Sequence, residues 1–153
     1  MSLQVGSKVP DFNLQGVDSK SHSLSDFKGK YLVLYFYPKD DTPGCTIEAK
    51  EFTSNYDEIR KIGAEVVGIS ADSYESHCSF RDKHALKILL LSDPSLKTIR
   101  EYGAYGNRGV FGEGTMRKTF IIDKDGKLVK EYPKVSPLGH SKEVISFLKN
   151  LSK

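Results

Sequence analysis

The stretch YLVLYFYPKDDTPGCTIE, residues 31–48, decides the fold. Its first seven residues, Tyr31 to Tyr37, form a continuous apolar and aromatic run, which is typical of a strand buried on both faces. Polar residues and two prolines interrupt the run, and an apolar pattern with helical spacing follows at Ala49, Phe52, Tyr56 and Ile59. The stretch therefore predicts a buried strand that leads through a short turn into a helix.

Patterns of buried strands and helices continue to alternate along the chain. Two further buried strands are predicted, at AEVVGIS (64–70) and KILLLSD (87–93). Helices are predicted from Asp72-Ser73 to about His84, from Pro94-Ser95 to near Gly103, and from Ser136-Pro137 onward. Hairpins are predicted at residues 11–14 with 21–24, and at residues 115–123 with 127–133 around Asp125-Gly126.

This order of elements indicates an α/β fold with a central mixed β-sheet flanked by helices and an N-terminal β-hairpin. The second hairpin supplies the antiparallel part of the sheet. Neither a repeat nor a linker interrupts the chain, so we expect a single domain over residues 1–153. The glycine-rich stretch from Gly103 to Gly114 is interpreted as a mobile loop.

The composition excludes several classes of protein. The formal net charge is +3 and charges of both signs are interspersed, which gives no indication of nucleic-acid binding. The longest apolar run is too short to cross a bilayer, and Met1 to Pro10 lacks a targeting pattern. Two cysteines do not make a disulfide scaffold, so we expect a cytoplasmic protein in which any disulfide is transient.

Cys45 is the candidate nucleophile. Thr42 is a good N-cap and Pro43 suits the first helical position, which places Cys45 in the first turn, where the helix dipole favours a thiolate. Lowering the pKa of a thiol from about 8.5 to about 6 requires roughly 3.4 kcal/mol, whereas a helix terminus supplies ~0.3–1 kcal/mol, or up to ~2 when partly buried. A cation is therefore needed, and Arg117, expected on a strand, is the candidate.

Donors around Cys45 suit a reaction in which negative charge develops on oxygen. The Thr42 hydroxyl, the backbone amides of Gly44 and Cys45, and the Arg117 guanidinium together offer such donors. Gly44 permits a close backbone approach, and Pro38 and Pro43 help to exclude water. On spacing alone, an inert half-buried cysteine remains an alternative.

The segment PKDDTPGCT (38–46) resembles the active-site signature of the peroxiredoxins, and FYPKDDTPGCTIEAKEF (36–52) is similar to their Q-type, or bacterioferritin comigratory protein, subfamily. The likeness extends to GISADS, LLLSDP and MRKTFIIDKDGKLV, and covers nearly the whole chain. The resemblance implies a thioredoxin-like fold and a monomer. It implies that Cys45, with Thr42, Arg117 and Pro38, reduces hydrogen peroxide and organic hydroperoxides. Thioredoxin or a similar dithiol donor would then recycle the enzyme. The resemblance also implies that Glu48 orients Arg117 and, with Gly44, helps to bind substrate; a surface carboxylate is the alternative for Glu48.

The second thiol departs from the commonest pattern. Many members of this subfamily carry a resolving cysteine five positions after the first, where this chain has Lys50. Cys78 is the only other cysteine, and some members place a resolving cysteine on the corresponding helix. Cys78 lies off the helix face defined by His77, Phe80 and His84, so we expect partial exposure. Two alternatives stay open, a resolving Cys78 and a one-cysteine peroxidase reduced by an external thiol.

Other functions could use the same residues. A redox-sensing or holdase-type binding protein would use the same oxidation of Cys45 as a switch. The spacing of His77, Cys78 and His84 is unlike a zinc motif, and His140 is interpreted as a capping or surface residue. The glycines at 106–114 lack a nucleotide-binding motif. We therefore expect neither a metal nor a cofactor.

Overall fold

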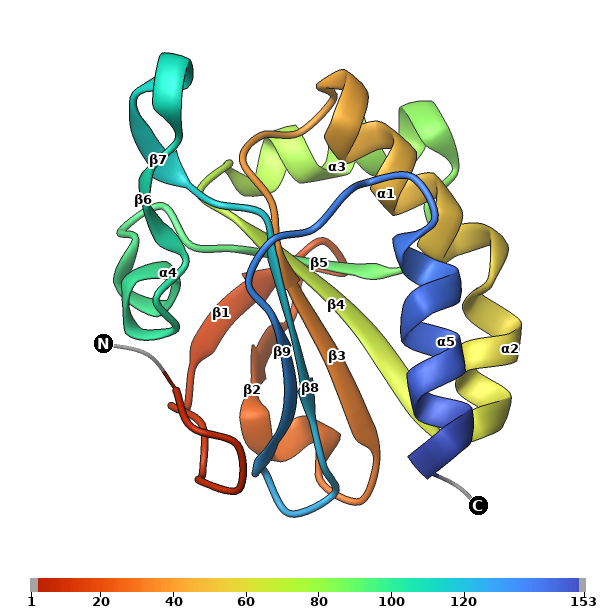
Figure 1. Ribbon diagram of the computed structural model, residues 1–153. Helices are drawn as coiled ribbons and strands as arrows, with labels where there is room; N and C mark the ends of the chain where they lie inside the picture. Colours follow the sequence, from red (N-terminus) through yellow and green to blue (C-terminus); the bar gives the residue numbers. More distant parts are fainter. Residues whose placement is uncertain (1–2, 152–153) are drawn as a thin grey trace.

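The computed structural model describes residues 3–151 and is built on one seven-stranded mixed sheet (Figure 1). The strand order is β2-β1-β5-β4-β3-β8-β9. The strands are β1 (Asn13–Gly16), β2 (Ser21–Ser23), β3 (Tyr31–Phe36), β4 (Ala64–Ser70), β5 (Leu89–Ser92), β8 (Lys118–Ile122) and β9 (Leu128–Tyr132). Strands β3, β4 and β5 run parallel, and the two hairpins add the antiparallel strands, as predicted.

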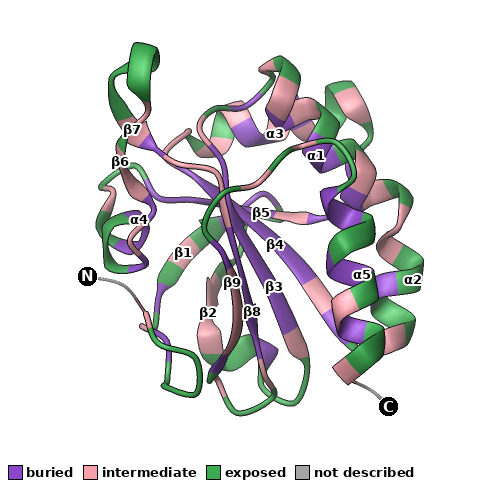
Figure 2. Ribbon diagram, viewed as in Figure 1, coloured by how far each residue is buried: buried purple, intermediate pink, exposed green. Residues whose placement is uncertain are grey.

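Strand β3 lies near the middle of the sheet and is buried on both faces, as its unbroken apolar sequence predicts (Figure 2). Its Tyr35 is paired in register with Gly68 of β4. A Cβ at Gly68 would stand 2.8 Å from Cζ of Tyr35, so only glycine leaves room for that ring. The turn that follows β3 is thereby attached to a fully buried strand of the sheet.

Helices cover both faces of the sheet. Helices α1 (Pro43–Ser54), α2 (Tyr56–Ile62), α3 (Tyr74–His84) and α5 (His140–Leu151) contribute to the core on one face. Helix α4 (Lys97–Glu101) and the 3-10 turn η1 (Leu24–Phe27) contribute to the core on the other face. Figure 1 shows α1, α2 and α5 together on one side of the strands and α4 on the opposite side. The expected fold class is confirmed.

Three predicted elements are corrected by the structure. The helix after Cys45 is two helices, because Asn55 adopts φ −102° and ψ 9° between them. The Asn55 side chain there donates to the carbonyl of Glu51 and to the hydroxyl of Ser141 on α5. The last helix begins at His140, which leaves residues 133–139 as a connecting segment. Helix α4 is also shorter than the pattern suggested.

The glycine-rich stretch forms a hairpin where a loop was expected. Strands β6 (Tyr105–Asn107) and β7 (Glu113–Thr115) pair antiparallel, and the 3-10 turn η2 (Gly109–Phe111) joins them. Gly109 and Gly112 have positive φ values of 66° and 76°, which only glycine adopts without strain, so they shape the tip. Figure 1 shows this hairpin standing away from the main sheet.

Helices in the described residues, 3–151, are all too short or too polar to cross a membrane. The first two and last two residues of the expected 1–153 domain lie outside the described part of the chain.

Candidate active site

The candidate site begins where β3 ends and α1 starts. Thr42 is the N-cap residue and Pro43 the first helical residue, as the sequence predicts. The Thr42 hydroxyl donates to the carbonyl of Lys39 at 2.9 Å and makes no capping bond to the helix. Cys45 lies in the first turn and is 1% exposed. The thiol therefore lies at the positive end of the helix dipole and is nearly closed off from solvent.

Arg117 connects Cys45 to a buried carboxylate. Its Nη1 donates to Oε1 of Glu48 at 2.8 Å, and its Nη2 donates to Sγ of Cys45 at 3.5 Å. Arg117 lies between β7 and β8, one residue before the strand on which it was expected. Burial lowers the pKa of Arg117, but the charges of Cys45 and Glu48 outweigh this effect and raise that pKa. The guanidinium therefore stays charged beside the sulfur.

Glu48 is a deeply buried side chain, and the surface alternative for it is wrong. It is 1% exposed, and its Oε2 has no hydrogen-bond partner among the described residues. Burial raises the pKa of Glu48 from 4.5 to about 7, although the ion pair with Arg117 opposes the rise. Glu48 therefore changes its charge close to neutral pH.

This raised pKa makes stability depend on pH. A carboxyl whose pKa is higher in the folded state stabilises the fold below about pH 4.5 and loses that contribution as the pH rises through about 7. We expect Glu48→Gln, relative to the wild type, to gain on the order of 3 kcal/mol in unfolding free energy between pH 4.5 and pH 8. Urea unfolding of both proteins at the two pH values measures this change. If the difference in unfolding free energy between the two proteins is the same at both pH values, Glu48 remains ionised throughout the range.

Gly44 allows Arg117 to approach the helix. A Cβ at this position would stand 2.9 Å from Nη2 of Arg117 and 3.3 Å from Cγ of Pro137. The first contact is closer than real Cβ atoms make, so any larger residue moves the guanidinium. The close approach predicted for Gly44 is therefore made by Arg117 and by the segment that precedes α5.

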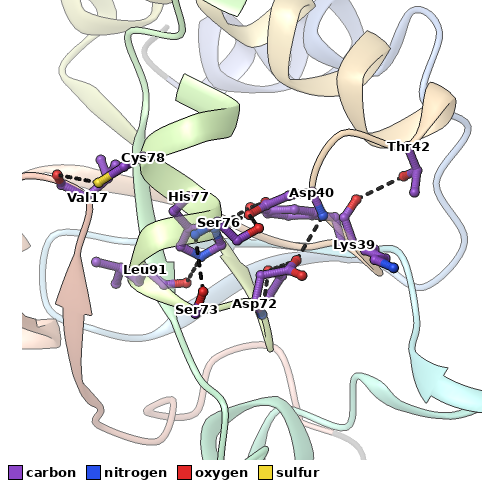
Figure 3. Close-up of polar contacts among 12 residues, drawn as sticks. Val17, Lys39, Asp40, Thr42, Asp72, Ser73, Ser76, His77, Cys78 and Leu91 are labelled. Atoms are coloured by element: carbon purple, nitrogen blue, oxygen red, sulfur yellow. Dashed lines mark hydrogen bonds and ion pairs between the residues drawn. The ribbon is translucent and has the colours of Figure 1, made fainter. Parts of the chain in front are cut away.

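A buried polar network lies behind the turn (Figure 3), and the sequence analysis missed it. Asp40 accepts hydrogen bonds from the hydroxyls of Tyr37 at 2.6 Å and Ser76 at 2.8 Å, and its Oδ2 lies 2.6 Å from Nδ1 of His77. Nε2 of His77 lies 3.0 Å from the carbonyl of Leu91, which can only accept, so Nε2 carries a proton. A second proton therefore lies between Nδ1 and Asp40.

The same network joins the turn to the end of β4. The backbone N–H of Asp40 donates to Oδ2 of Asp72 at 2.8 Å, and the hydroxyl of Ser70 donates to the same oxygen at 2.7 Å. Asp40, Asp72 and His77 each place a potential ligand atom within 4.8 Å of the others. Because these atoms already take part in hydrogen bonds within the protein, the group is best explained as a support for the turn.

Cys78 follows His77 on α3 and is partly buried, as predicted. Its Sγ lies 4.0 Å from the carbonyl of Val17, and Nη1 of Arg81 donates to the same carbonyl at 3.1 Å. Cys45 and Cys78 are both free thiols. For Cys78 to leave this position, α3 has to loosen at the end that His77 holds.

His140 is the first residue of α5 and is buried, so of the two alternatives for it, a capping or a surface residue, the surface one is wrong. Its ring is buried against Phe52 and Tyr132, with Nδ1 2.9 Å from Oε1 of Glu143 and Nε2 2.8 Å from Oγ1 of Thr119. Burial lowers the pKa of His140, although Glu143 raises it in part. His140 thereby anchors the end of the 133–139 segment next to the candidate site.

Comparison with known proteins agrees with this geometry. The model of the AhpC/TSA family matches residues 5–131. The chain is 43% identical to peroxiredoxin Bcp of Bacillus subtilis, with 99% of each chain covered. Its structure matches Xylella fastidiosa PrxQ, a cysteine-to-serine mutant, with a TM-score of 0.96 at 31% identity, covering 100% of this chain and 99% of the other.

A second solved structure is that of the Xanthomonas campestris bacterioferritin comigratory protein, described in connection with its alkyl peroxide reduction activity. The TM-score is 0.91 at 32% identity, and the match covers 98% of this chain and 100% of that one. The structural match, the family match and the sequence identity over the full chain thus all indicate the same kind of protein. The chain belongs to the AhpC/TSA family and is a peroxiredoxin of the Bcp, or Q, type, a thiol peroxidase.

Proposed function

We propose that Cys45 is the peroxidatic cysteine and that it acts with Arg117, Thr42 and the first-turn amides. The observation that carries this proposal is the position of Arg117, whose two terminal nitrogens bind Glu48 and the sulfur of Cys45. A cation held at 3.5 Å, added to the helix N-terminus, supplies the stabilisation of a thiolate that the helix alone lacks.

In the proposed reaction the Cys45 thiolate attacks the terminal oxygen of a hydroperoxide. An S–O bond forms, the O–O bond breaks, and the electron pair leaves with the second oxygen, which takes up a proton to give water or an alcohol. Cys45 is oxidised to sulfenic acid and the peroxide is reduced. Arg117 and the first-turn N–H groups stabilise the charge that develops on the leaving oxygen.

Four residues near Cys45 have supporting roles in this proposal. Since the Thr42 hydroxyl donates to Lys39, its oxygen is left to accept the O–H of the peroxide. Gly44 lets Arg117 approach, and Glu48 fixes the orientation of its guanidinium. Pro38 lines a shallow cleft together with Arg117 and limits the access of water.

Gly44→Ala provides a test of this arrangement. Alanine suits the first turn of a helix, so we expect stability to be retained or slightly raised. The added Cβ displaces Arg117, so kcat/KM for hydrogen peroxide should fall on the order of 10- to 100-fold. Steady-state kinetics and thermal unfolding of the same samples measure the two effects. Full activity in a folded variant would contradict the role given to the position of Arg117.

We further propose that a thioredoxin-like dithiol restores Cys45, after Cys78 has resolved the sulfenic acid as an intramolecular disulfide. Cys78 is the only other cysteine in the sequence and is a free thiol, which supports this step. A one-cysteine cycle, in which an external thiol attacks the sulfenic acid, is the mechanistic alternative.

Cys78→Ser separates the two cycles. With thioredoxin and its reductase as the reductant, we expect the variant to lose turnover but still to consume about one equivalent of peroxide, because Cys45 is intact. Wild type in the same assay is the control. Turnover of Cys78→Ser at the wild-type rate would exclude the intramolecular disulfide and leave the one-cysteine cycle.

The remaining features are proposed on the same basis. Residues 1–153 act as one domain, since helices from both halves of the chain share the core cluster that contains Cys45. The protein acts as a monomer, as the resemblance to the subfamily implies. It acts in the cytoplasm, which accords with two cysteines that are both free thiols. Sedimentation of the reduced protein measures its oligomeric state.

A further inference from the structure

The turn that follows β3 is attached to helix α3 at two places. The first is the buried contact described above, in which Oδ2 of Asp40 lies 2.6 Å from Nδ1 of His77. The second is made by the next residue, Asp41. Its Oδ2 accepts a hydrogen bond from Nζ of Lys83 at 2.8 Å, and its Oδ1 lies 2.9 Å from Nε2 of His84. Two consecutive residues of the turn thus hold the first and the last turn of α3.

Asp41 has a backbone conformation that few residue types accept. Its φ is 60°, in the left-handed region, which aspartate and asparagine adopt more readily than other residues with a Cβ. Hydrogen bonds from His84 and Lys83 lower the pKa of the Asp41 carboxyl, so this group is ionised at neutral pH. Because an ionised carboxylate can only accept, Nε2 of His84 donates to it. Both oxygens of Asp41 are therefore bound to the end of α3.

Cys78 lies on α3 between these two attachments. Its Sγ is 4.0 Å from the carbonyl of Val17, whereas Sγ of Cys45 accepts from Nη2 of Arg117. Figure 3 shows the side chain of Cys78 directed toward Val17 and away from Thr42, the N-cap residue of α1. The two sulfurs thus face different partners. A disulfide has a narrow range of geometries, so one can form between them only after α3 has released Cys78.

Helix α3 depends on its contacts with the rest of the fold. It has 11 residues, and isolated helices shorter than about 12–15 residues are only marginally stable in water. We therefore expect α3 to loosen as a unit once its contacts are weakened. Every contact that is lost when α3 loosens, including those made by Asp41, makes the release of Cys78 less favourable.

We propose that Asp41 is a positioning residue for Cys78 and that its contacts with α3 set the rate at which the sulfenic acid is resolved. The inference rests on the proposed roles of Cys45 and Cys78. In the resolving step the Cys78 sulfur attacks the Cys45 sulfur. An S–S bond forms, the S–O bond breaks, and the hydroxide leaves with the thiol proton as water.

The same contacts set how readily the enzyme is inactivated by its own substrate. Until Cys78 is released, the sulfenic acid of Cys45 can react with a second peroxide. A second S–O bond then forms, the O–O bond of the peroxide breaks, Cys45 becomes sulfinic acid, and the peroxide is reduced. Asp41 therefore determines the balance between resolution and over-oxidation.

Asp41→Asn tests this inference. Asparagine accepts the same backbone conformation but offers no charge to Lys83 and His84. Because these contacts lie near the surface, we expect the disulfide to form about 3- to 10-fold faster, while the reaction of Cys45 with hydrogen peroxide keeps its wild-type rate constant. Rapid acid quenching, alkylation of the remaining thiols and mass spectrometry measure both steps. The peroxide concentration that converts half of Cys45 to sulfinic acid during turnover should rise by the same factor.

Two further variants and salt serve as controls. Asp82→Asn removes the same charge at an exposed position whose ion pair lies within α3, and should leave both rates unchanged. Lys83→Gln/His84→Phe removes the two donors but keeps a ring against Phe80, and should accelerate resolution as Asp41→Asn does. High salt should accelerate resolution in wild type but have little effect in Asp41→Asn, because exposed ion pairs are screened.

The possible outcomes separate this inference from the proposed function. Resolution at or below the wild-type rate in Asp41→Asn, or equal acceleration in Asp82→Asn, would overturn the inference while leaving the peroxidase intact. A wild type that forms no disulfide between Cys45 and Cys78 would overturn it together with the proposed resolving step. Failure of Cys45 to react with hydrogen peroxide would overturn the proposed function itself.

Discussion

Replacement of Cys45 by serine is expected to abolish peroxide reduction, with kcat/KM for hydrogen peroxide reduced on the order of 1000-fold or more. A serine hydroxyl at this position stays protonated, and the helix terminus and Arg117 together supply far less energy than its ionisation needs. The variant should fold, since serine differs from cysteine by one atom and the turn is held by the network around Asp40.

Two measurements check this result. Peroxide consumption with an excess of dithiol gives the rate, and a sulfenic-acid probe such as dimedone identifies the oxidised residue by mass spectrometry. Dimedone should label Cys45 in Cys78→Ser and label neither residue in Cys45→Ser. If dimedone labels Cys78 in Cys45→Ser and this variant consumes one equivalent of peroxide, then Cys78 is the nucleophile and the assignment to Cys45 is wrong.

Arg117→Gln is expected to produce the second largest loss. Removal of one donor that stabilises developing charge on oxygen typically costs on the order of 100- to 1000-fold in rate, and this variant also removes the cation beside the sulfur. The variant leaves Glu48 buried without its partner, which raises the pKa of that carboxyl further. The loss of activity at pH 7 should therefore be accompanied by a moderate loss of stability.

Arg117→Lys is the matched control. It retains the charge but cannot bind Cys45 and Glu48 at once through two nitrogens of a planar fork. We expect its kcat/KM to lie between those of wild type and Arg117→Gln. A double-mutant cycle with Glu48→Gln completes the design, because effects of Glu48 that act through Arg117 should disappear once Arg117 is absent. Additive losses would show that Glu48 acts independently.

Much of the fold was predictable because local patterns and tertiary structure agree. The apolar run at Tyr31 to Tyr37 is continuous because β3 is buried on both faces, and the Asp125-Gly126 turn forms where the residue types require it. The break at Asn55 was not predictable from periodicity. Phe52 and Ile59 keep helical spacing across it, and the side-chain bonds of Asn55 that accompany the break include one to a residue 86 positions away.

The candidate site was predictable in part. Thr42, Pro43 and Cys45 are neighbours in sequence, so helix-capping rules place the thiol directly. The contact of Arg117 with Cys45 spans 72 positions, and only the physical need for a cation and the resemblance suggested it. The pairing of Asp40 with His77 gave no such signal. Asp40 is one of two adjacent aspartates in a turn, and the pattern that places His77 on a helix face with Phe80 does not indicate a partner 37 positions away.

The pair formed by Asp40 and His77 also constrains how this sequence can diverge. The two side chains share a proton across 2.6 Å, and both are buried, with 0% of the His77 side chain and 3% of the Asp40 side chain exposed. Loss of His77 would leave the buried Asp40 carboxylate with the hydroxyls of Tyr37 and Ser76 alone, and loss of Asp40 would leave Nδ1 of His77 with only the Tyr37 hydroxyl, 3.5 Å away, so each single replacement is costly. In the descendants of this sequence the two positions should therefore be inherited as a unit, kept together or exchanged together.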